Sequence, residues 1–185
     1  MEVGSEFGPL AGLVGTWEGD EGLDVAFQHS RGDIGETRFR KRAEFNPFGP
    51  VDNGQQALYS LDYRMSAWRA GENDPFHTEI GYWLWDVADG QVTRSFMVPR
   101  GSTILAGGLA QPDATTFTMQ AEVGSETYGI LSNTYLARSA RTVLYQVTVT
   151  VEGDTFSYDQ LTTIEHAKMS EPLEHRDTNA LHRVS

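Results

Sequence analysis

The sequence contains no cysteine, and this absence excludes several kinds of site at once. A chain without cysteine cannot form disulfide bonds, thiolate zinc sites or cysteine nucleophiles. Basic residues are also few: 14 lysines and arginines stand against 26 acidic residues, which gives a net charge of −12. Because no basic run interrupts this acidity, nucleic acid and anionic membrane surfaces are poor partners.

No segment has the form of a targeting or membrane-spanning sequence. The opening residues, MEVGSEFGPLAGLVGTW, lack a basic region and a long apolar core, so no signal peptide is expected. No stretch approaches the roughly 20 apolar residues of a spanning helix. We therefore expect a cytoplasmic protein that does not bind a membrane.

The motifs of the common hydrolases and nucleotide-binding enzymes are absent too. The chain has no G-x-S-x-G, no P-loop and no G-x-G-x-x-G. An H-x-E occurs at His77 and Glu79, but the P-C-x-x-C that follows it in zinc deaminases is missing. No catalytic residue is identified at this level, and whether the chain is an enzyme stays open.

What the sequence does contain is alternation. In RTVLYQVTVTVEGDTF, the residues Tyr145, Val147 and Val149 share one face and polar residues occupy the other, which is the period of a half-buried strand. The turn signal EGD ends this run and TFSYDQLTTIEHAKM begins another, so the two runs predict a hairpin. The length of 185 residues and a hydrophobic content of 39% indicate one globular domain, residues 1–185.

Eight further segments also read as strands and are separated by turn-forming residues. They are GTWEGDEGLDV, ETRFRKRAEFN, QQALYSLDYRMSAWR, HTEIGYWLWDV, QVTRSFMVP, STILAGGLA, TTFTMQAEV and EPLEHRDTNALHRV. FGPLAGLVG suggests a short helical turn, and YGILSNTYLARSA is ambiguous. The fold class predicted is all-β: a single antiparallel up-and-down barrel of about ten strands, of the lipocalin or fatty-acid-binding-protein kind, whose interior can hold one small ligand.

The segment HTEIGYWLWDV carries apolar side chains on both faces, with Ile80 and Tyr82 on one and Trp83 and Trp85 on the other. A strand with one face in water does not have this pattern. Three interpretations remain open. A second copy could cover one face, with the tryptophans as a candidate surface of a homodimer; the inner face could line an apolar cavity; or these residues could all pack in a core.

Five histidines are the remaining candidates for chemistry: His29, His77, His166, His175 and His182. They form no H-x-H or H-E-x-x-H cluster, so a zinc site with several histidines is unsupported. Haem iron needs only one protein nitrogen in an apolar slot. His29 lies in a polar loop and His182 near the chain end, and we expect both to be solvated.

Three elements, PLAGLVGTWEGDEG, FHTEIGYWLWDVADGQV and EPLEHRDTNALHRV, occur in an order that resembles the nitrobindin family. These fatty-acid-binding-protein-like haem barrels are also found as the C-terminal domain of some THAP proteins, the THAP4 type. The resemblance implies a ten-stranded antiparallel barrel that holds haem b, with a last-strand histidine on ferric iron. It also implies nitric oxide binding and isomerisation of peroxynitrite to nitrate.

The resemblance assigns roles to three residues. His175 matches the proximal histidine, the metal ligand. His77 matches the pocket histidine that precedes E-x-G-Y, and Trp17 matches the tryptophan of the first strand, which plugs the end of the barrel.

Strand parity leaves two arrangements of the last strand open. If His175 faces the cavity, Leu173 and Asp177 share its face, and an inward Asp177 needs a hydrogen-bond partner. If His175 faces outward, Arg176 faces the cavity and favours an anionic ligand such as a carboxylate.

Three functions are therefore carried forward. The first is a haem-binding barrel with nitrobindin-like chemistry. The second is a haem-free carrier of a fatty acid or another small hydrophobic or anionic ligand. The third is an interaction protein with a filled barrel and a dimer face.

Overall fold

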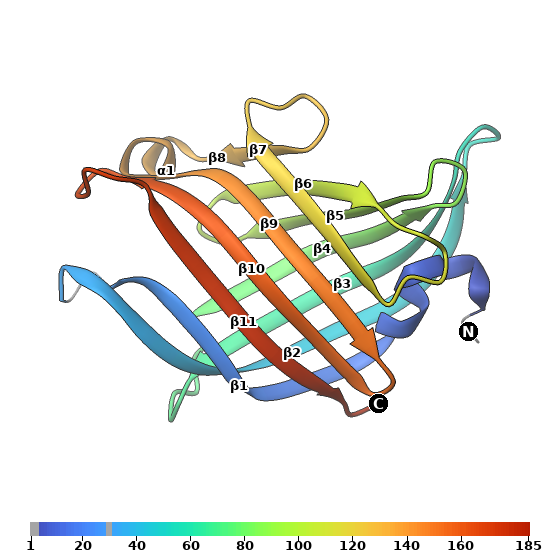
Figure 1. Ribbon diagram of the computed structural model, residues 1–185, viewed down its shortest axis with the longest axis horizontal. Coiled ribbons are helices and arrows are strands. Elements are labelled where there is room, and N and C mark those ends of the chain that lie inside the picture. The colour runs from blue at the N-terminus through green and yellow to red at the C-terminus, as the bar shows by residue number, and fades with distance from the viewer. Residues whose placement is uncertain (1–3, 29–30) are drawn as a thin grey trace.

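A computed structural model describes residues 4–28 and 31–185, and this part of the chain forms a closed barrel of eleven strands (Figure 1). The strands are β1 Gly15–Gln28, β2 Asp33–Asp52, β3 Ala57–Arg69, β4 His77–Asp86, β5 Gln91–Val98, β6 Ser102–Leu109, β7 Thr116–Val123, β8 Gly129–Ser132, β9 Ala140–Glu152, β10 Thr155–His166 and β11 Leu173–Arg183. A 3-10 helix, η1 Ser5–Leu13, precedes them, and a short helix, α1 Thr134–Ser139, lies between β8 and β9. The predicted all-β barrel and its helical opening are confirmed.

Each of the ten predicted strand segments forms one strand, and the eleventh, β8, comes from the ambiguous segment. Neighbours along the chain pair antiparallel around most of the barrel. The exception is β8, which lies between β6 and β7 and runs parallel to β7, while β7 pairs directly with β9. The topology is thus up-and-down with one short insertion.

The β9–β10 hairpin shows why alternation located the strands correctly. Tyr145, Val147 and Val149 are buried, and the residues between them are more exposed. The turn that follows β9 contains Gly153 at φ +58°, a left-handed conformation that glycine adopts without steric cost.

The two faces of β4 have different surroundings, and these contradict the interpretation in which the tryptophans form a homodimer surface. Trp83 and Trp85 are each 1% exposed and pack inside the barrel, whereas Ile80 and Tyr82 are 51% exposed on its outer surface. The tryptophans as a homodimer surface are therefore wrong, because neither is accessible from outside. The outer face of β4 is still apolar.

One end of the barrel is closed by η1. Phe7, Leu10 and Leu13 of this helix are buried in the core. The indole nitrogen of Trp17 donates a hydrogen bond of 2.7 Å to the carbonyl oxygen of Leu13, and the Arg183 guanidinium lies 4.1 Å from the Trp17 ring centre. This packing fixes a solid hydrophobic core at the end where the helix lies.

Strand β1 contains a bulge that changes which residues point inward. Gly19 pairs with Lys41 of β2, but Gly22 pairs with Phe39. Strand β1 therefore contains one more residue than β2 over this interval. Trp17 before the bulge and Asp24 after it consequently both face the interior, although their sequence parity is opposite.

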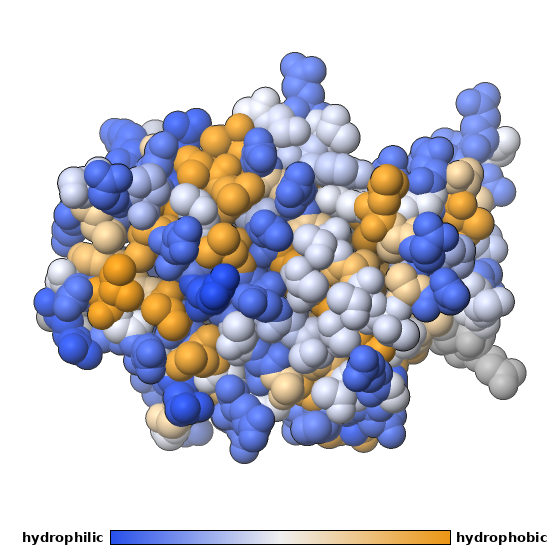
Figure 2. Space-filling view, viewed as in Figure 1, coloured by the Kyte–Doolittle hydropathy of each residue, from blue (hydrophilic) through white to orange (hydrophobic). Residues whose placement is uncertain are grey.

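The barrel closes where β1 pairs with β11, and Asp24 lies opposite Asp177 in this pairing. On the outer face seen in Figure 2, hydrophobic side chains lie in several separate groups among hydrophilic ones. Among the described residues, no helix has the length and apolar character needed to cross a membrane.

Candidate functional site

A cavity of about 950 Å³ occupies the end of the barrel opposite η1. The inner faces of the strands form its walls, and the turns β3–β4, β5–β6 and β10–β11, together with α1, surround its mouth. Its volume lies in the upper part of the range for small-molecule and cofactor sites. The described part of the barrel is therefore not filled throughout, contrary to the third function considered above.

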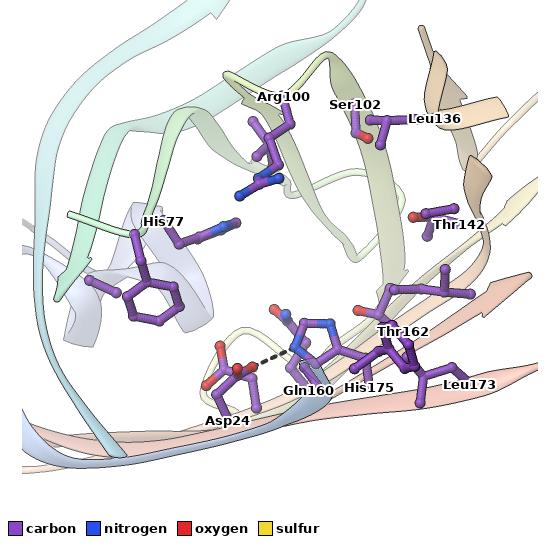
Figure 3. A pocket seen from close by; sticks show the side chains of 18 of the residues that line it. Asp24, His77, Arg100, Ser102, Leu136, Thr142, Gln160, Thr162, Leu173 and His175 are labelled. Atoms are coloured by element: carbon purple, nitrogen blue, oxygen red, sulfur yellow. Dashed lines mark hydrogen bonds and ion pairs between the residues drawn. The ribbon is translucent and has the colours of Figure 1, made fainter. Parts of the chain in front are cut away.

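His175 faces this cavity from β11, together with Leu173 and Asp177. The structure thus has the first of the two parity arrangements. The Nε2 atom of His175 lies 2.5 Å from Oδ1 of Asp24 on β1. Its other ring nitrogen, Nδ1, has no hydrogen-bond partner among the described residues. Figure 3 shows the ring between Asp24 and the open cavity.

Opposing effects act on the pKa of His175. Burial lowers this pKa, but the hydrogen bond to Asp24 and the charges of Asp24 and Asp177 raise it more, so the net shift is upward. Asp177 is not left unpaired: Tyr158 donates a hydrogen bond of 2.8 Å to it, and Nζ of Lys41 lies at 3.5 Å. Lys41 also donates to the hydroxyl of Tyr158.

A second polar group is centred on Arg94, which does not itself line the cavity but bonds Glu79 and Tyr145, which do. The side chains of Arg94 and Glu79 are 6% and 3% exposed and form a salt bridge. Tyr63 accepts a hydrogen bond of 3.0 Å from Arg94 and donates one of 2.9 Å to Glu79. Arg94 also donates to Tyr145. Burial alone would raise the pKa of Glu79, but the charge of Arg94 and the hydrogen bond with His77 hold this pKa well below its usual range.

The upper walls combine aromatic and aliphatic side chains with a cationic mouth. The apolar lining includes Phe27, Phe39, Phe76, Phe96, Val98, Ile104, Leu136, Ile164 and Leu173. Arg69, Arg100 and Lys168 also line the cavity. Arg69 is paired with Glu72, whereas the side chain of Arg100 has no ion pair among the described residues. Arg100 points into the cavity from the wall across from His175 (Figure 3).

The residues predicted from sequence have different positions. His77 lines the cavity, on the side across from His175 in Figure 3, and its Nε2 lies 3.0 Å from Oε1 of Glu79. Trp17 is buried in the hydrophobic core and does not line the cavity. Arg176 lies on the outer surface, 60% exposed and 3.6 Å from Asp159. The structure therefore does not have the alternative in which Arg176 faces the cavity.

The three remaining histidines differ in their positions relative to the cavity. His166 lines the cavity, and its Nδ1 accepts a hydrogen bond of 3.3 Å from the backbone of Lys168. His182 is exposed on β11. His29 lies outside the described residues.

Sequence reasoning did not find several residues that define the site. Asp24, Lys41, Gln160 and Arg100 all line the cavity. Polar residues at inward positions of an alternating strand could have indicated Lys41, which has the parity of Phe39 and Ala43. The bulge hid Asp24, because parity counted from Trp17 places Asp24 outside.

The residues of the cavity fit a haem group on three counts. The cavity is large enough, and much of its lining is apolar. One inward imidazole has a carboxylate on one nitrogen and, within the described part of the chain, no partner on the other. A histidine that ligates a metal usually donates its other ring N–H to a carboxylate or carbonyl in this way. Within residues 4–28 and 31–185, no three histidine, aspartate or glutamate side chains form a group that could hold a bare metal ion.

Comparison with known proteins agrees with this geometry. The structure is similar to the crystal structure of Rv2717c from M. tuberculosis, with a TM-score of 0.67 and 17% sequence identity over 95% of each chain. No match was found among proteins with curated descriptions. The family model described as the THAP4-like, heme-binding beta-barrel domain matches residues 6–183. The chain is a ligand-binding barrel that belongs to this THAP4-like haem-binding β-barrel family.

Proposed function

We propose that the protein binds haem b in the cavity, with the imidazole of His175 as the ligand that the chain provides to the iron. The observation that carries this proposal is the His175 ring itself, which has one nitrogen on Asp24 and the other beside a large cavity, without a hydrogen-bond partner among the described residues. Haem iron needs one protein nitrogen in such a position. Bound there, haem would supply an iron with a position open to nitric oxide or peroxynitrite.

The chain's own residues would hold and shield this group. The aromatic residues Phe39, Phe76 and Phe96 line the cavity and would give a bound group apolar walls. On the side across from His175, His77 is fixed by its contact with Glu79, which is itself bound to Arg94. An isomerase activity on peroxynitrite would use this His77 side of the cavity.

Titration of the purified protein with hemin tests the proposal. We expect a Soret shift in the parent protein, and loss of the axial-histidine spectrum in His175→Ala. His182→Ala is a matched control, because His182 lies on the same strand but is exposed outside. His77→Ala should keep the axial-histidine spectrum. A parent protein without a Soret shift, or an unchanged spectrum in His175→Ala, contradicts the proposal.

The second candidate function is a haem-free carrier of a fatty acid or a similar small anion. The observation that favours it is Arg100 at the mouth of a partly apolar cavity, a cation that has no ion pair with any described residue. Native mass spectrometry of the protein as purified tests it: a co-purified acid in the parent, and not in Arg100→Gln, supports the carrier. Haem alone in the spectrum contradicts it.

A further inference from the structure

We propose that Asp24 is a positioning residue of the haem site, which holds the His175 ring through Nε2 and leaves Nδ1 as the nitrogen that faces the iron. This inference rests on the proposed function. It adds a role for Asp24, which lies near the N-terminus, whereas His175 lies near the C-terminus. Asp24 and His175 are separated by 151 residues in the sequence and join β1 to β11.

Asp24 reaches this position only through the bulge in β1. Without the extra residue between Gly19 and Gly22, strand parity would turn Asp24 outward and bring its apolar neighbours Leu23 and Val25 into the cavity. A bulge that turns a carboxylate inward is costly unless this carboxylate gains a partner there. His175 is that partner, at 2.5 Å.

The neighbouring carboxylate has a different partner. Asp177 lies directly opposite Asp24 in the β1–β11 pairing, and both line the cavity. Asp177 is held by Tyr158 at 2.8 Å and by Lys41 at 3.5 Å. Asp177 is thus engaged by its own partners, and among the described residues Asp24 is the carboxylate that is hydrogen-bonded to the His175 ring.

This arrangement has a chemical consequence for ligation. A carboxylate that accepts a ring N–H fixes the tautomer and the orientation of the imidazole and makes its other nitrogen a stronger donor. The contrary hypothesis is that Asp24 competes with the iron, so that Nε2 must leave Asp24 before it can ligate. The two hypotheses predict opposite effects of removing Asp24.

The experiment compares Asp24→Ala and Asp24→Asn with the parent by hemin titration and by resonance Raman spectroscopy of the ferrous iron–histidine stretch. If Asp24 positions the ring, Asp24→Ala lowers haem affinity about 10–100-fold, the usual cost of losing such a partner, and lowers the stretching frequency. Asp24→Asn, which can still accept the N–H, restores most of the affinity but keeps a lowered frequency. Asp20→Ala removes an exposed carboxylate of the same strand and should match the parent.

Unchanged or tighter haem binding by Asp24→Ala overturns the positioning role and supports competition. A failure of the proposed function itself looks different, since the parent then shows no Soret shift or His175→Ala keeps the iron–histidine stretch. A variant that loses affinity only because it misfolds is recognised by a changed far-ultraviolet circular dichroism spectrum. In that case Asp24→Asn, with the carboxylate replaced by its closest neutral analogue, decides the question through its Raman frequency.

Discussion

Individual charged side chains inside this barrel are held in close pairs that join different strands. Arg94 of β5 bonds Glu79 of β4, and His175 of β11 bonds Asp24 of β1. A buried charge that loses its partner costs far more than an exposed one, because no water replaces the lost contact. We therefore expect substitution of one partner in such a pair to destabilise the protein strongly.

Glu79 should make the protein sensitive to acid. Its pKa is lowered in the folded state, so its stabilising contribution is present above the pKa of an unfolded glutamate, about 4.3, and is lost as the pH falls below that value. We expect the free energy of unfolding, measured in urea, to fall as the pH is lowered from 5 toward 3. Glu79→Gln should reduce this pH dependence.

At neutral pH, the same substitution should destabilise the protein by about 3–5 kcal/mol, because it leaves Arg94 buried without its counter-charge. The control is Glu44→Gln, which removes an exposed partner of Arg42 and should cost less than ~1 kcal/mol. Equal stabilities of the two variants would contradict this account of the Arg94–Glu79 pair.

At the scale of the elements, η1 and the strands divide the barrel into a packed end and an open end. Leu10 of η1 is completely buried, and it lies among core residues away from the cavity lining. Leu10→Ala should lower the free energy of unfolding by about 2–5 kcal/mol through the lost burial and the hole left behind. Ligand affinity should not change, because Leu10 is not one of the residues that line the cavity.

Urea unfolding and hemin titration on the same sample measure both effects. Leu109→Ala is the matched control, since Leu109 is 76% exposed and its loss should change stability by less than about 0.5 kcal/mol. Haem affinity that falls in parallel with stability in Leu10→Ala would show that the two ends of the barrel are coupled.

Elements with regular alternation could be predicted from the sequence, and irregular ones could not. The hairpin of β9 and β10 follows from period two and one turn signal, and the inward position of His175 matches one of the two parities considered for β11. The bulge in β1 is a departure from the period, so Asp24 could not be placed. β8 has only four residues and runs parallel to the preceding strand β7, so it shows neither a full alternating pattern nor a hairpin signal.

For the whole molecule, the outer face of β4–β6 is the surface that we propose for a homodimer. Ile80 lies directly opposite Met97 in the sheet, and both are more than half exposed, with Tyr82 beside them. Exposed apolar side chains that adjoin one another often mark a contact surface. We expect sedimentation to show twice the monomer mass at high concentration, and Ile80→Glu with Met97→Glu to give the monomer. A parent that stays monomeric contradicts the proposal.

The pairing of β1 with β11 also determines when the site comes into being. During synthesis, β1 is the first of the strands to leave the ribosome and β11 is the last. Strand β1, which carries Asp24, can therefore pair with β11, which carries His175, only after all the other strands have been made. Contacts so remote in sequence form late and slowly in folding. The nascent chain can thus offer no finished pocket to a ligand, and loading must follow the closure of the barrel.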